Sequence, residues 1–263
     1  MMRNAVLAVI FALIFTLGTF AQATPQLVTA GPFATAEEAV NFANSLPEAN
    51  REYAQFLCEY RRGTPATAAY RVWYETGGDT TTDQGLRWQT STFSDLAAAV
   101  AAPEANKNLS QFSPCFNPNR NPTGTTVTLF YIPEPAAPAA PYVLVDRSFA
   151  SASEATAWAN NNLAPGVRLT AQFLPELSAP TQTSSSWRII TSPSFAPTTQ
   201  ANWRWQAVEN DSAGTPLQTD TALAVMNQDD GLTGYRLSVQ FDTASTTSRI
   251  VLFTITVADE PTP

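Results

Sequence analysis

The sequence predicts an α+β fold of four βαββ units that form two tandem, pseudo-symmetric domains. The first observation behind this prediction is a short pattern that occurs four times: a basic residue, three other residues, then Gln-Phe. The copies are REYAQF from Arg51, KNLSQF from Lys107, RLTAQF from Arg168 and RLSVQF from Arg236. A strand and a helix are expected before each copy and another strand after it. The pattern therefore indicates four related units.

The second observation is a constant spacing between matching segments. AQFL at Ala54–Leu57 recurs at Ala171–Leu174, and 171 − 54 = 117. RWQ at Arg87–Gln89 recurs at Arg204–Gln206, and 204 − 87 = 117. Matches at one spacing are typical of an internal duplication.

The third observation is a Pro/Ala segment, PEPAAPAAP at 133–141, that divides the chain. Such a segment cannot hold a helix or an interior strand and favours an extended spacer. We therefore expect one duplicated βαββ-βαββ domain at 24–132 and a second at 142–263.

The first 23 residues have the features of a signal peptide. Arg3 provides a basic start, Ala5–Phe20 is apolar, and Ala21–Ala23 has the small-x-small pattern of a cleavage site. The apolar run is shorter than the roughly 20 residues of a membrane-spanning helix, although an uncleaved anchor is the alternative. We expect cleavage after residue 23, no membrane span afterwards, and a secreted, periplasmic or cell-surface protein.

Capping residues and helical spacing predict the four helices. Thr35 with Glu38, and Ser151 with Glu154, have the spacing of a capping box, and apolar residues follow on one helical face. The expected helices are Ala36–Ser45, Asp95–Ala101, Glu154–Asn161 and Asp220–Gln228.

β-Branched and aromatic residues predict three strands in each unit. The expected strands are Leu27–Thr29, Glu52–Tyr60 and Tyr70–Glu75; Leu86–Thr90, Asn108–Phe112 and Thr126–Ile132; Tyr142–Val145, Arg168–Leu174 and Trp187–Thr191; and Trp203–Val208, Tyr235–Phe241 and Arg249–Val257. Because side chains alternate along a strand, one set of aromatic residues should face the core, namely Phe56, Phe112, Phe173, Phe241, Trp88 and Trp205. We expect each domain to form a mostly antiparallel six-stranded sheet with two helices on one face.

The opposite face of each sheet is then polar, and it is the candidate binding surface. Guanidinium and amide groups suit carboxylates, sulfates or sugar hydroxyls, and an exposed Trp73 can stack on a sugar. Two alternatives are that this face simply keeps the sheet soluble, or that two such faces bury each other. The candidate ligand-binding residues are Arg51, Gln55, Arg71, Trp73, Lys107, Gln111, Arg168, Gln172, Arg236 and Gln240.

Composition argues against several kinds of chemistry. The net charge of −8 and the isoelectric point near 4.5 argue against nucleic acid or an anionic membrane surface as a partner. The sequence has no histidine, which excludes Ser-His-Asp and Cys-His catalysis in their usual forms. Glu59 and Glu176 are candidate paired carboxylates, but surface charge is the simpler interpretation. We expect no enzyme activity, no metal site and no cofactor.

Cys58 and Cys115 are the only two cysteines, and they lie at comparable places in the first two units. Because an exported chain can oxidise such a pair, we expect a structural disulfide between them. The Cys-x-x-Cys spacing of redox proteins is lacking.

Two short segments, GPFATAEEAVNFANSL and RSFASASEATAWANN, resemble the first strand and helix of SPOR-type peptidoglycan-binding repeats. SPOR units lack the extra strand found here, and the resemblance implies an envelope glycan as ligand. Two functions are therefore expected: an exported non-enzymatic scaffold or protein-interaction protein, or an envelope glycan or cell-wall binding module. A buried Trp73 favours the first, and a solvated Trp73 favours the second.

Overall fold

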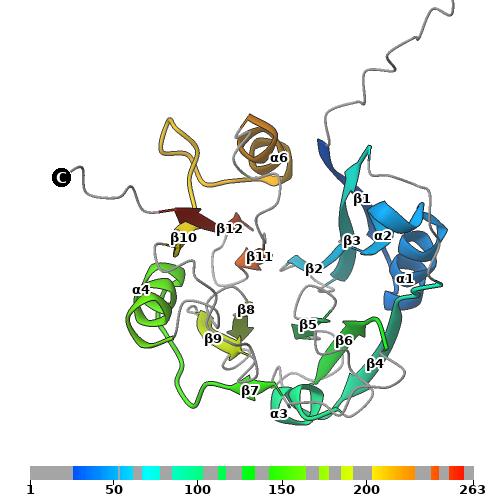
Figure 1. Ribbon diagram of the computed structural model, residues 1–263, viewed down its shortest axis with the longest axis horizontal. Coiled ribbons are helices and arrows are strands. Elements are labelled where there is room, and N and C mark those ends of the chain that lie inside the picture. Colours follow the sequence, from blue (N-terminus) through cyan, green and yellow to red (C-terminus); the bar gives the residue numbers. More distant parts are fainter. Residues whose placement is uncertain are drawn as a thin grey trace, which may run out of the picture.

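Four βαββ units stand around a ring in the computed structural model of this protein (Figure 1). The structure describes residues 26–52, 54–61, 67–77, 85–102, 112–116, 126–133, 142–163, 172–177, 185–191, 203–228, 238–242 and 249–257. The α+β class is as expected. The expectation of two six-stranded sheets is wrong, because the strands form four separate three-stranded sheets.

Each unit contributes one sheet and at least one helix. Unit 1 contains β1 (Gln26–Phe33), α1 (Ala36–Ser45), α2 (Glu48–Glu52), β2 (Gln55–Arg61) and β3 (Thr67–Thr76). Unit 2 contains β4 (Gln89–Phe93), α3 (Leu96–Val100), β5 (Phe112–Phe116) and β6 (Val127–Tyr131). Unit 3 contains β7 (Val143–Leu144), α4 (Ala152–Asn162), β8 (Gln172–Leu177) and β9 (Ser185–Thr191). Unit 4 contains β10 (Trp203–Val208), α6 (Thr219–Gln228), β11 (Ser238–Asp242) and β12 (Arg249–Val257).

The last strand of each unit is the middle strand of its sheet and pairs antiparallel with the other two, as in the order β1-β3-β2. The second strands, β2, β5, β8 and β11, lie nearest the centre of the ring (Figure 1). They contact one another in a cycle, because β2 and β8 each contact both β5 and β11. The first strands therefore form the outer edges of the four sheets.

Among the described residues, buried hydrophobic side chains form four clusters, one at each junction between neighbouring units. In each junction the face that carries the helix packs on the bare face of the next sheet. Junction 1–2 joins Ala39, Val40, Ala43, Phe56, Tyr70 and Val72 to Trp88, Cys115, Phe130 and Ile132. Junction 2–3 joins Leu96, Ala99, Val100, Val127, Leu129 and Tyr131 to Tyr142 and Ile190. Junction 3–4 joins Phe149, Ala155, Ala159, Phe173, Trp187 and Ile189 to Trp205, Val251 and Phe253. Junction 4–1 joins Leu217, Ala222, Met226, Ile250 and Leu252 to Leu57 and Trp73.

The expected polar sheet face is wrong for the described residues of unit 1, and the strands show why. Neighbouring residues of a strand point to opposite faces. In β3, Val72 and Trp73 are neighbours, and both are buried. A sheet with two apolar faces needs cover on both sides. In the ring, each sheet has a neighbouring unit on both faces. A single helix layer would cover only one face and leave the apolar residues of the other face in water.

Junctions 1–2 and 3–4 contain the same arrangement of aromatic rings. Phe56 stacks on Phe130 with ring centroids 4.2 Å apart, and Phe173 stacks on Phe253 at 4.5 Å. Trp88 meets the edge of Phe56, and Trp205 meets the edge of Phe173 in the same way. The expected burial of Phe56, Phe173, Trp88 and Trp205 is therefore confirmed. The side chains of Phe112 and Phe241 lie outside the described residues.

The first helix begins at Ala36 as predicted, and α3, α4 and α6 begin within two residues of their predicted starts. Thr35 accepts a hydrogen bond from the Glu38 N–H at 3.1 Å, and the Glu38 carboxylate accepts one from the Thr35 N–H, which completes a capping box. Ser151 accepts from the Glu154 N–H, whereas the Glu154 carboxylate accepts from the Ala150 N–H. These bonds satisfy N–H groups that have no partner within the helix.

The first inner strand begins later than the repeated pattern predicts, because β2 begins at Gln55 and Arg51 lies in α2. The residues before β5, β8 and β11 lie outside the described residues. The expected signal peptide at 1–23 and most of the segment 133–141 lie outside the described residues. Within the described part of the chain, no helix is long and apolar enough to cross a membrane.

Candidate functional site

The repeated pattern predicts that Arg51 lies on a sheet face, and this prediction is wrong. Arg51 lies in the short helix α2, and its side chain is only 3% exposed. Its guanidinium pairs with the Glu48 carboxylate at 3.0 Å and donates to the backbone oxygens of Asn44 and Leu46. The Arg51 backbone oxygen accepts a hydrogen bond from the Trp88 indole at 2.7 Å. Arg51 therefore closes the end of α1 and fastens unit 1 to unit 2.

Trp73 is also buried, with 1% of its surface exposed, because unit 4 covers it in junction 4–1. Gln55 pairs with Trp73 across the sheet and is partly exposed. Arg71 shares this sheet face, and its guanidinium donates to the Gly31 backbone oxygen at 3.4 Å. The structure therefore brings Gln55, Arg71 and Trp73 together, but the Trp73 ring is packed against protein and has no free face for a sugar.

The remaining candidates are only partly placed. Gln172 and Gln240 lie on the inner strands β8 and β11, opposite Ile190 and Val251, and their side chains are outside the described residues. Lys107, Gln111, Arg168 and Arg236 also lie outside the described residues. The carboxylates of Glu59 and Glu176 do as well. Within the described part of the chain, no group of histidine, cysteine or acidic residues has the arrangement of a metal site.

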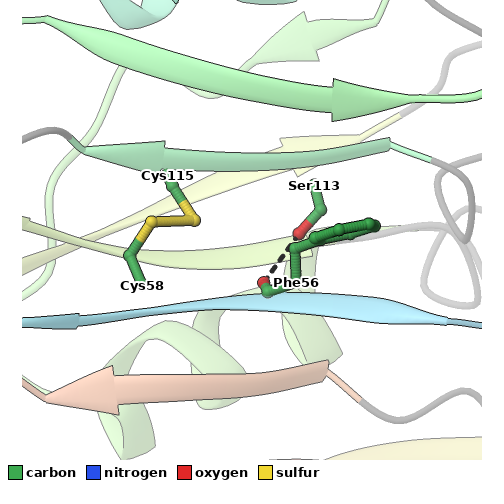
Figure 2. Close-up of a disulfide and its surroundings, with 4 residues drawn as sticks. All are labelled: Phe56, Cys58, Ser113 and Cys115. Atoms are coloured by element: carbon green, nitrogen blue, oxygen red, sulfur yellow. Dashed lines mark hydrogen bonds between the residues drawn. A yellow bond between two sulfur atoms is a disulfide. The ribbon is translucent and has the colours of Figure 1, made fainter. Parts of the chain in front are cut away.

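The expected disulfide between Cys58 and Cys115 is confirmed, and it joins the inner strands β2 and β5 with 5.8 Å between the Cα atoms (Figure 2). Two residues along, the Ser113 hydroxyl donates to the Phe56 backbone oxygen at 3.0 Å. Both links span 57 residues, which means that β2 and β5 run parallel in constant register. The disulfide therefore holds unit 1 against unit 2 at the centre of the ring.

Three asparagines form a contact that the sequence interpretation missed. Asn44 accepts a hydrogen bond from the Trp88 N–H at 2.8 Å and donates to the Trp88 backbone oxygen at 2.9 Å. Asn160 binds both backbone groups of Trp205, and Asn227 binds both of Leu27, at 2.8 to 2.9 Å. In each case a helix of one unit binds the backbone in, or directly before, the first strand of the next unit. We call these contacts the asparagine clasps.

A sequence signal for the clasps was present. Each asparagine lies eight residues after the first residue of its helix, since 44 − 36, 160 − 152 and 227 − 219 all equal 8. The amide can imitate one residue of a neighbouring strand because it has one donor and one acceptor side by side. The position in unit 2 that corresponds to the clasps lies outside the described residues.

The clasps give a first testable prediction. An Asn44→Asp or Asn160→Asp substitution keeps the acceptor but removes the donor, so that a carboxylate faces a backbone oxygen. We expect each substitution to lower the free energy of unfolding by about 1–3 kcal/mol, measured by urea denaturation. Asn41→Asp on the exposed face of α1 is the matched control and should change it by less than about 0.5 kcal/mol. Equal effects at positions 41 and 44 would contradict the assigned role.

The outer edges of the four sheets differ in how much backbone remains open. The clasp occupies Trp88, the residue directly before β4, and by alternation the backbone groups of Thr90 and Thr92 also point away from β6. Within the described part of the chain, these groups have no hydrogen-bond partner. The edge of β1 is interrupted by a bulge between Ala30 and Phe33.

The other two outer edges differ from that of β4. β7 has only two residues, whereas β10 has six and carries a clasp at Trp205 in its middle. The backbone oxygen of Glu209, which follows β10, accepts a hydrogen bond from Leu217. β4 has two successive outward-pointing residues, Thr90 and Thr92, beyond its clasp. Its exposed residues, Gln89 and Thr92, are polar.

In comparisons with known proteins, no family model, curated protein or solved structure matches this chain significantly.

Proposed function

We propose that this chain is an exported, non-enzymatic interaction protein that binds an extended segment of another protein along the outer edge of β4. The observation that carries the proposal is the open backbone of Thr90 and Thr92 next to the Asn44 clasp. A free strand edge presents N–H and C=O groups to which a partner segment can add as a further strand. The polar side chains of β4 keep such an edge soluble while it is free.

Burial elsewhere supports a binding role for this edge rather than for the sheet faces. Both faces of the unit 1 sheet are buried, one in junction 1–2 and the other in junction 4–1. Trp73, on which the glycan alternative depends for stacking, is one of the residues buried there. Export agrees with the disulfide, because such bonds persist in oxidising compartments.

The test uses the full mature chain and a displayed library of random peptides as probe. We expect selected peptides to slow hydrogen exchange at the Thr90 and Thr92 amides. A Thr90→Pro substitution removes an outward N–H without removing a bond to β6, so it should weaken peptide binding at least tenfold. Thr90→Val is the matched control, because it keeps the N–H and should bind as the native chain does.

Two results would contradict this proposal. One is peptide binding that Thr90→Pro leaves unchanged while circular dichroism shows the variant to be folded. The other is the absence of any selected peptide together with retention of the chain on purified peptidoglycan or on neutral or acidic polysaccharides, which would favour the glycan alternative.

A further inference from the structure

The Asn44 side chain takes the place of one strand residue beside Trp88. Its oxygen accepts from the Trp88 N–H at 2.8 Å, and its nitrogen donates to the Trp88 backbone oxygen at 2.9 Å. Exchange of both bonds with a single residue is the pattern of an antiparallel pair, whereas a parallel strand divides them between two of its residues. The clasp therefore fills the position at which an antiparallel neighbour of β4 would meet Trp88.

This position sets where a segment bound to the outer edge of β4 must stop. The segment can pair with Thr92 and Thr90, but the clasp already occupies Trp88. In antiparallel addition the segment runs from Thr92 toward Thr90 and reaches the clasp with its carboxyl side. The helix α1, which carries Asn44 and contacts β4, then stands in the path of any continuation. A chain that ends at this point fits the edge without bending away.

The charges at the two ends of this edge differ in sign. Arg87 precedes the clasped Trp88 and is exposed, and one of its guanidinium nitrogens donates to the Leu86 backbone oxygen. Asp95, which is also exposed, lies beyond the other end of β4. A guanidinium group binds a carboxylate through charge-assisted hydrogen bonds, whereas an amino terminus would meet a charge of its own sign at Arg87. A carboxyl terminus is therefore the chain end that suits the clasp.

We infer that the partner segment is the carboxyl-terminal end of another protein, which adds antiparallel to β4 with its terminal carboxylate beside the Asn44 clasp and Arg87. The inference rests on the proposed function and specifies its partner. Backbone bonds to Thr90 and Thr92 provide affinity for many extended sequences. The carboxylate provides the selection, because a free chain end gains a charged partner at Arg87 that an internal segment lacks.

The experiment compares peptides that differ only at their last group. One random library is displayed with free carboxyl ends and a second is displayed within a loop, and both are selected on the full mature chain. Each selected peptide is synthesised with a terminal carboxylate and with a terminal amide, and calorimetry measures both dissociation constants. We expect the carboxylate form to bind about tenfold more tightly than the amide form.

An Arg87→Gln variant tests the charge at the clasp. It should weaken the carboxylate form to the affinity of the amide form and leave the amide form unchanged. Arg204→Gln is the matched control, because Arg204 is also exposed and precedes the clasped Trp205, and 204 − 87 = 117. This control should change neither affinity. Damage to the fold would weaken both peptide forms alike, so the ratio of the two affinities reports the charge alone.

The direction of the bound segment is tested separately. A paramagnetic label on the amino end of the carboxylate peptide broadens the nuclear magnetic resonance signals of nearby amides. Antiparallel addition should broaden the signals of Phe93 and Asp95 and spare Arg87. Broadening at Arg87 instead would show a parallel segment and overturn the inference.

The outcomes separate this inference from the proposed function. Equal affinities of the carboxylate and amide forms would overturn the inference, since an internal segment then binds as well as a chain end, and would leave the peptide-binding edge in place. An Arg87→Gln variant that weakens both forms equally would overturn it as well. If neither library yields a binding peptide, the proposed function itself fails, and the inference fails with it.

Discussion

Replacing Arg51 with methionine is expected to lower the free energy of unfolding by about 3–5 kcal/mol. The side chains of Arg51 and Glu48 are 3% and 6% exposed, so removing the guanidinium leaves a buried carboxylate without its cation. The backbone oxygens of Asn44 and Leu46 also lose a donor. Urea denaturation of the oxidised protein measures the change.

Two controls make the Arg51 result specific. Arg87→Met removes the same group from an exposed position and should change the stability by less than about 0.5 kcal/mol. The double variant Glu48→Met and Arg51→Met removes both charges and should be more stable than Arg51→Met alone, because no buried charge remains unpaired. A double variant that is less stable than both single variants would show that the buried pair is not the source of the loss.

Removing the disulfide by Cys58→Ala and Cys115→Ala together is expected to cost about 4 kcal/mol, as the chain-entropy relation gives for a loop of 57 residues. The disulfide reduces the number of conformations that the unfolded chain can adopt. Its removal therefore raises the entropy of the unfolded state and stabilises that state. The double variant and the native chain with its disulfide reduced should therefore unfold at similar urea concentrations.

A Ser113→Ala substitution separates the disulfide from its neighbouring contact. It removes the hydroxyl that donates to the Phe56 backbone oxygen and should cost about 1–3 kcal/mol in either redox state. A double cysteine variant as stable as the oxidised native chain would show that β2 and β5 are held in register without the covalent bond.

The local features of this fold could be predicted because their causes lie within a few residues. The helix Ala36–Ser45 was predicted with both ends correct, since Thr35 and Glu38 bond to neighbouring backbone groups. The burial of Trp88 and Trp205 followed from alternation along a strand. The disulfide followed from the comparable places of its two cysteines.

The candidate site was predicted less well because its residues depend on distant ones. Arg51 was assigned to a strand face from the repeated pattern, but the helix α2 intervenes and turns its side chain toward the end of α1. The asparagine clasps were missed, although their helix position recurs. The residue that an asparagine amide binds cannot be identified from the sequence, because that residue lies in a neighbouring unit.

From the sequence alone follow the strand–helix–strand–strand order of the four units, the start of the helix Ala36–Ser45 and the burial of Phe56, Phe173, Trp88 and Trp205. Which residues cover these side chains depends on how the four units pack together. Trp73 and Val72 required cover on two faces, and a closed ring supplies it by packing unit 4 on unit 1. Leu27 and Asn227, which help to close that ring, are 200 residues apart. No local propensity connects such residues, so only the packing of whole units determines that they meet.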